Sequence, residues 1–250
     1  MSRQCLALLM PFGQVKASML QDAEALADGG MYEHIIENFG DVPFYPRRVP
    51  THTVAFLAVL GYEVKSRFPL PLGVNVLPND GMSALAIAQA IGAEFIRVNV
   101  YTGARVTDQG VIQGQAHRLQ RYRKLLGSSV SVFADVAVKH SAPLGHRELQ
   151  DEVEDTVERG RADAIIVSGT ATGKETPVEE VKVARAAAGR TPVFVGSGAK
   201  LACLSDLLAC ADGLIVGTAF KKEGLTLNSV DISRVREFMA AVRRGVSSRA

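Results

Sequence analysis

The sequence has no tryptophan, only three cysteines and no long hydrophobic run. Cys5, Cys203 and Cys210 form no C-x-x-C motif, so we expect neither a zinc site nor a disulfide scaffold. We expect free thiols in a reducing compartment instead. No apolar stretch reaches the ~20 residues that a membrane-spanning helix needs. These absences predict a soluble, cytoplasmic protein without a transmembrane segment.

An excess of charge of one sign is also missing. The 28 Lys and Arg residues are nearly balanced by 26 Asp and Glu, which gives a net charge of +2. A nucleic-acid-binding surface usually needs a clear basic excess, so no nucleic-acid partner is expected. Hydrophobic residues make up 47% of the chain and charged residues 22%, which is typical of a globular protein with a full core.

Short apolar runs alternate with helical patterns along the whole chain. Because the runs are apolar throughout, they favour parallel strands that are covered on both faces. The segments between them have helical periodicity, and several end on glycine, a common helix stop. The predicted strands lie at 6–10, 32–37, 72–77, 94–100, 130–136, 163–168, 192–196 and 213–217.

Eight strand–helix units in this length predict one (β/α)8 TIM barrel, a single domain over residues 1–250. A doubly wound open sheet is the alternative, but the glycine-rich G-x-G-x-x-G loop that usually follows its first strand is absent. We find no linker and no change of composition that would divide the chain.

Polar residues follow the predicted strands, where a barrel keeps its chemistry. A buried charge is costly unless it is paired or meets a ligand, so these residues predict a polar pocket, with a purely structural network as the alternative. The candidate catalytic residues are Glu37, Asp135, Lys139 and His140. The candidate substrate-binding residues are Asn38, Asp41, Asn75, Asp80, Arg97 and Asn99.

Two roles are open for the residues after the fifth predicted strand. His140 could form an acid–base pair with Asp135, or it could cap a turn before Pro143. Lys139 could form a Schiff base if burial lowered its pKa. No cofactor or metal is predicted: four carboxylates at this barrel end could hold Mg²⁺ through oxygen ligands, but no ligand spacing supports it.

Glycine-containing loops follow the last predicted strands in "SGTATG", "FVGSGAK" and "LIVGTAFK". Glycines let backbone N–H groups approach an anion, and barrels often bind phosphate at their seventh and eighth loops. Simple turns are the alternative. The candidate phosphate-binding residues are Gly169, Gly196, Ser197, Gly198, Gly217 and Thr218, with Lys200 or Lys221 as counter-charges.

Long central blocks resemble the BtpA/SgcQ family: "IIENFGDVPF", "PLGVNVLPND", "FIRVNVYTGARVTDQGVIQGQA", "FADVAVKHSAPLG" and "DGLIVGT". The resemblance implies a TIM-type barrel related to phosphate-binding barrels. It also implies either an enzyme of sugar or nucleotide metabolism or a factor for photosystem I biogenesis that is peripherally attached to a membrane. The opening stretch departs from the family pattern, because it keeps Pro11 and Gly13 but lacks the family's histidine.

Two functions therefore compete. The first is an enzyme that acts on a phosphorylated small molecule, a sugar phosphate or a nucleotide, by general acid–base catalysis of the lyase, isomerase or glycosyl-transfer type. The second is a non-catalytic assembly or stability factor for a membrane complex such as photosystem I. A homo-oligomer is compatible with both.

Overall fold

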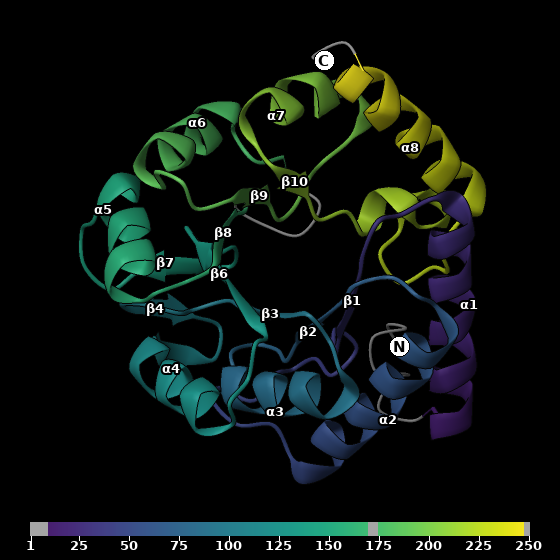
Figure 1. Cartoon of the computed structure of the whole chain (residues 1–250), viewed down its shortest axis with the longest axis horizontal. Helices are drawn as coiled ribbons and strands as arrows, with labels where there is room; N and C mark the ends of the chain where they lie inside the picture. The colour runs from purple at the N-terminus through teal and green to yellow at the C-terminus, as the bar shows by residue number, and fades with distance from the viewer. Residues whose placement is uncertain (1–9, 170–174, 248–250) are drawn as a thin grey trace.

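A computed structural model describes residues 10–169 and 175–247. Its centre is a curled sheet of seven parallel strands, which pair in chain order (Figure 1). The strands are β1 (His34–Glu37), β2 (Leu72–Asn75), β3 (Phe95–Val98), β6 (Ser131–Val136), β8 (Ala164–Val167), β9 (Val193–Val195) and β10 (Gly213–Leu214).

The helices form a ring outside the sheet, and α1 lies beside α8 where the ring returns to its start (Figure 1). They are α1 (Phe12–Gly29), α2 (Thr51–Arg67), α3 (Gly81–Ile91), α4 (Ala116–Leu125), α5 (Leu149–Glu154), α6 (Val178–Ala187), α7 (Leu204–Cys210) and α8 (Ile232–Ser247). This order of strands and helices confirms the predicted α/β architecture. The predicted strand at 6–10 lies outside the described residues, so an eight-stranded closure stays a prediction.

One predicted strand end was wrong, and the first helix begins at Phe12. Pro11 has a backbone suited to a helix start, and the first turns of the helix pack on α2. The Phe12 and Phe56 ring centroids are 4.7 Å apart, and Lys16 pairs with Glu63 at 3.1 Å. The last strand is shorter than predicted and ends at Leu214.

A small antiparallel sheet in the loops was not predicted. It contains β4 (Ala104–Thr107), β5 (Gly110–Gln113) and β7 (Ser141–Pro143), in the order β5–β4–β7. Its hairpin turns at Asp108 and Gln109 and is followed by Gly110 at φ 90°, where glycine is favoured. Because β7 follows the loop after β6, this sheet anchors the segment that carries Lys139 and His140.

The interior of the curled sheet has an aromatic layer beneath a polar one. Phe95, Phe133 and Phe194 stack across β3, β6 and β9, with centroids 4.5 Å and 5.0 Å apart. Gly73 leaves room for the ring of Phe95, since a Cβ there would lie 2.2 Å from it. Alternate residues of a strand share a face, so the residues two positions after the phenylalanines form the next layer, toward the strand ends. That layer holds the candidate site.

His34 gives the fold a pH-dependent element near the start of β1. It is 5% exposed, its Nε2 has no partner among the described residues, and burial lowers its pKa. Because the unfolded chain takes up a proton on this histidine more readily than the folded protein does, protonation favours unfolding. The folded protein therefore has its full stability above the ordinary histidine pKa of about 6.5 and loses stability as the pH falls below it.

We therefore expect the melting temperature to fall less between pH 7 and pH 5 in His34→Leu than in the unchanged protein. The difference should be at most about 1.4 kcal/mol per pH unit. Thermal unfolding at a series of pH values measures it, with His52→Leu on the exposed side of α2 as the control. Parallel pH profiles for His34→Leu and the unchanged protein would contradict this assignment.

Candidate functional site

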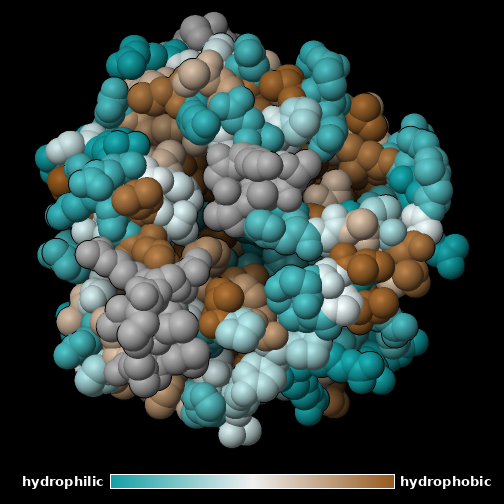
Figure 2. All heavy atoms as spheres, turned by 180° about the vertical axis from the view of Figure 1, so that it is seen from behind, coloured by the Kyte–Doolittle hydropathy of each residue, from teal (hydrophilic) through white to brown (hydrophobic). Residues whose placement is uncertain are grey.

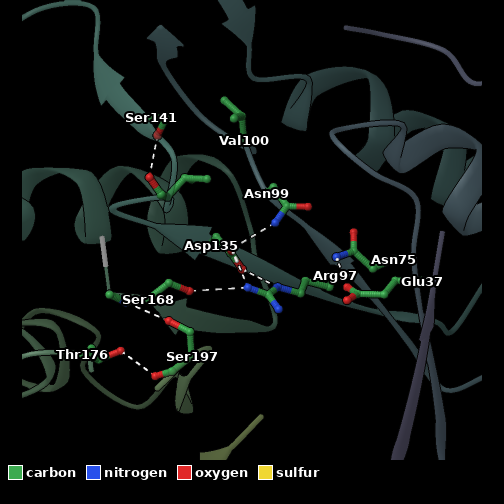
Figure 3. A network of polar contacts seen from close by, with 12 residues as sticks. Glu37, Asn75, Arg97, Asn99, Val100, Asp135, Ser141, Ser168, Thr176 and Ser197 are labelled. Carbon is green, nitrogen blue, oxygen red and sulfur yellow. Dashed lines mark hydrogen bonds and ion pairs between the residues drawn. The ribbon is translucent and has the colours of Figure 1, made fainter. Parts of the chain in front are cut away.

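A buried ion pair forms the centre of the polar layer (Figure 3). Nε and Nη2 of Arg97 each donate to one carboxylate oxygen of Asp135 at 2.8 Å. Both side chains are almost fully buried, at 4% and 0% exposure. Asn99 Nδ2 also donates to Asp135, at 3.2 Å, and Arg97 Nη2 lies 3.4 Å from Ser168 Oγ. A bidentate arginine–carboxylate pair fixes both groups in one plane and one orientation.

Burial of Arg97 would by itself lower its pKa, but the adjacent Asp135 carboxylate outweighs that effect and the pKa is raised. Arg97 therefore keeps a permanent positive charge in the interior. Glu37, at the end of β1, contributes further in the same direction. The charges of Arg97 and Asp135 compensate each other, and this makes their burial tolerable.

Two buried amide oxygens in this layer have no partner among the described residues: Oδ1 of Asn75 and Oδ1 of Asn99. The two residues are 1% and 6% exposed and come from the ends of β2 and β3. Asn75 Nδ2 donates to Glu37 at 3.3 Å, so each amide is held by its nitrogen while its oxygen stays available. Figure 3 shows both side chains beside the Arg97–Asp135 pair. Buried acceptors of this kind usually have partners.

Of the two roles open for His140, the acid–base pair with Asp135 has no support in this geometry. Asp135 is engaged by Arg97 and Asn99, whereas His140 is exposed in a turn with φ 56°. Lys139 is the residue of this loop that belongs to the polar layer. Burial lowers the pKa of its amine and Arg97 lowers it further, while Glu37 and Asp135 oppose the shift.

Two of the six predicted phosphate-binding residues have backbone N–H groups that are already used. Gly196 donates to Val167 O at 2.7 Å, and Gly169 donates to Ser197 Oγ at 3.0 Å. Gly196 is instead needed for packing, because a Cβ there would lie 2.5 Å from Ser168 Oγ and 3.1 Å from Arg97 Nη2. The prediction that the N–H groups of Gly169 and Gly196 bind an anion was therefore wrong, because both already donate to protein oxygens.

The other four predicted residues of these loops keep free backbone donors. None of the backbone N–H groups of Ser197, Gly198, Gly217 and Thr218 donates to a described residue. Gly217 has open space around it, since a Cβ there would have nothing within 4 Å. The suggested counter-charges are paired elsewhere: Lys200 with Glu175 at 3.2 Å and Lys221 with Asp22 at 2.5 Å. Any anion here would rest on backbone amides.

Three predicted substrate-binding residues have structural roles outside the polar layer. Asn38 accepts from Leu77 N at 2.7 Å and donates to Asp41 at 3.1 Å, which joins the loops after β1 and β2. Asp80 caps α3 through Ser83 N and also accepts from Val49 N, at 3.1 Å and 3.0 Å. Their predicted contact with the same substrate as Arg97 has no support in this geometry.

Asp80 instead lines a separate cavity of about 130 Å³ between the starts of α3 and α4. The side chains of Arg47, Arg48 and Arg118 share that cavity. The four carboxylates considered for Mg²⁺ contact different residues: Glu37 contacts Asn75, Asp41 contacts Asn38, Asp80 contacts Ser83, and Asp135 contacts Arg97. The described residues contain no group of three His, Cys, Asp or Glu placed to hold a metal ion.

Comparison with known proteins places this architecture in a family. A model of the BtpA family matches residues 12–244. The chain belongs to the BtpA family. Its BtpA-family match leaves out only the ends of the chain, so the curled sheet and its polar layer both lie within the matched part.

Two BtpA relatives are equally similar to the chain in sequence. Photosystem I biogenesis protein BtpA of Synechocystis is 46% identical over 92% of this chain and 80% of its own length. An uncharacterized protein of Thermococcus kodakarensis is also 46% identical, over 91% of this chain and 86% of its own length. Within 10–169 and 175–247, no helix has the length and apolar character to cross a bilayer.

The fold is similar to that of N-(5'-phosphoribosyl)anthranilate isomerase from Pyrococcus furiosus. The TM-score is 0.58 at 12% identity, and the match covers 90% of this chain and 94% of the isomerase. At this identity the similarity establishes a shared TIM-like barrel fold and leaves the chemistry to the residues of the site.

Proposed function

We propose that the protein is an enzyme that binds a phosphorylated small molecule, a sugar phosphate or a nucleotide, at the carboxyl ends of its strands. The observation that carries this proposal is the pair of buried amide oxygens, on Asn75 and Asn99, that have no partner among the described residues and lie beside the Arg97–Asp135 pair. A buried acceptor without a partner costs about 1–3 kcal/mol. A substrate with hydroxyl groups would supply both missing donors.

The phosphate would bind at the loops after β9 and β10. Four backbone N–H groups there, from Ser197, Gly198, Gly217 and Thr218, have no described acceptor, and clustered backbone donors favour anions. The structurally similar isomerase is named for a phosphoribosyl compound, which supports a phosphorylated ligand by analogy of fold.

We assign proton transfer to Glu37 at the end of β1 and Lys139 in the loop after β6, which both interact with the charge of Arg97. Glu37 is exposed at its mouth and can act as a base, while Lys139 exchanges a proton more readily than an ordinary lysine. Arg97 and Asp135 hold each other and orient the substrate. This arrangement suits lyase, isomerase or glycosyl-transfer chemistry.

Phosphorylated ligands should raise the melting temperature, and Gly217→Val should abolish that shift. A ligand at 100 times its Kd stabilises the folded state by about 2.7 kcal/mol, and a side chain at residue 217 would occupy the space that the anion needs. The measurement is thermal unfolding against inorganic phosphate, sugar phosphates and nucleotides. Gly13→Val, at the start of α1 with open space around it, is the matched control. An equal shift in both variants would refute the cradle.

The assembly-factor function keeps one specific observation in its favour. Phe56, Val59 and Tyr62 on the outer side of α2 are 46%, 47% and 63% exposed, an apolar stripe that suits a partner or a second copy of the chain. On the face shown in Figure 2, by contrast, hydrophobic side chains are dispersed among hydrophilic ones. A well-folded protein with no thermal shift across the ligand panel would favour this second function.

A further inference from the structure

Among the described residues at the strand ends, Lys139 is a lysine without a hydrogen-bond or ion-pair partner. It makes no hydrogen bond or ion pair within residues 10–169 and 175–247, although it is only partly exposed. Lys200 and Lys221, by comparison, are both paired with carboxylates. An ammonium group has three donors and is strongly hydrated, so an unpaired, partly buried one is expensive to keep charged.

The backbone holds Lys139 in place by an uncommon conformation. Ala137 and His140 have φ values of 50° and 56°, in the left-handed region that residues other than glycine seldom occupy. Both residues lie in the four-residue segment between β6 and the short β7. Such conformations are retained where the surrounding structure demands them, and they gather at functional sites.

The charged groups around the amine come from three strands. Arg97 on β3 repels a proton on Lys139, and Asp135 on β6 attracts one but is already neutralised by its bidentate contact with Arg97. Glu37 on β1 is the remaining carboxylate that acts on it. Burial is the largest influence, and together these lower the pKa of Lys139, so more of it is neutral near pH 7 than of an exposed lysine.

We propose that Lys139 is a nucleophile that condenses with a ketone or aldehyde group of the substrate. This rests on the proposed function and names its substrate class: phosphorylated carbonyl compounds such as ketose or aldose phosphates. Its basis is geometric. The partly buried amine has no described partner and lies in the loop directly after β6, which left-handed residues on either side of it hold in place. The polar layer at the end of that strand offers the amide oxygens of Asn75 and Asn99, which have no described partner, as acceptors for hydroxyl groups.

The covalent step balances with these residues alone. The neutral Lys139 amine adds to the carbonyl carbon, and Glu37 carries one N–H proton to the new alkoxide oxygen, which gives a carbinolamine. A proton from solvent then converts its hydroxyl into water, which leaves, and a positively charged C=N iminium joins substrate and lysine. Arg97 stays outside this exchange because Asp135 holds it.

Borohydride trapping tests the proposal on the full chain. Dihydroxyacetone phosphate, ribulose 5-phosphate and ribose 5-phosphate serve as probes, with unphosphorylated dihydroxyacetone for comparison. Hydride adds to the iminium carbon, so the protein mass should rise by that of the probe less one oxygen, and peptide mapping should place the adduct on Lys139. Lys139→Met should lose the adduct, and Lys200→Met, a matched change at a paired lysine, should keep it.

A second measurement needs no substrate. Competitive acetylation with acetic anhydride over a range of pH values should label Lys139 at a lower pH than the exposed Lys222. Equal titration of the two lysines overturns the proposal. So does the absence of a Lys139 adduct with a probe that raises the melting temperature, and in that case the proposed function stands. Probes that neither bind nor react overturn both.

Discussion

Replacing Asp135 with asparagine should lower the free energy of unfolding by about 3–5 kcal/mol, because it leaves the buried Arg97 charge uncompensated. The shape of the side chain is kept, so the loss would report the charge and not a cavity. For a chain of this length the melting temperature should fall by about 10 °C. Thermal or denaturant unfolding measures it, independently of any ligand.

The matched control is Glu179→Gln, which removes an exposed ion pair with Lys182 on α6 and should change stability by less than about 0.5 kcal/mol. The double variant Arg97→Met, Asp135→Leu should be less destabilised than the sum of its single changes, since neither charge is then left alone. A loss below about 1 kcal/mol in Asp135→Asn would mean that Arg97 has another counter-charge and that the pair is not the centre of this layer.

Replacing Gly196 with alanine should destabilise the protein by about 1–3 kcal/mol or more, and it should also disturb the polar layer. A Cβ there would lie 2.4 Å from Ile166 Cγ2 on β8 and 2.5 Å from Ser168 Oγ, directly after β8. Neither group can move away freely, because Ile166 is fully buried and Ser168 contacts Arg97. Thermal unfolding and the ligand-dependent shift would both report the change.

Gly217→Ala is the companion variant, because it makes the same change in the loop after the next strand, where a Cβ meets nothing within 4 Å. It should change stability by less than about 0.5 kcal/mol. The two glycines occupy equivalent positions in the sequence pattern. Equal stability of the two variants would contradict the packing role of Gly196.

The repeating pattern of the fold could be predicted from the sequence because its signals are local. The runs that became β2, β3 and β8 are buried on both faces, and the glycines that follow α1 and α3 close these helices at φ 91° and 72°. The small β5–β4–β7 sheet was missed because its strands are short and because β7 pairs with β4 across a long stretch of chain. Arg105 on β4, for example, lies opposite Pro143.

The candidate site could be predicted only in outline. The strand-end rule brought Glu37, Asn75, Arg97 and Asp135 into one group, because parallel strands place their carboxyl ends together. It also included Asp80, whose position after β2 looks the same in the sequence but whose side chain caps α3. Position along a strand indicates the edge at which a residue lies, and the neighbouring elements decide which way its side chain points.

The sequence by itself thus determined the order of strands and helices, the family, and the set of polar residues from which a site could be built. Only the tertiary structure decided which of them meet: Arg97 with Asp135 across 38 residues of chain, Lys221 with Asp22 across 199, and Lys139 with no described partner. The physical reason is that secondary structure and strand ends follow from local patterns of apolar residues and glycine. Pairing of charges depends on distances that only the packed fold defines.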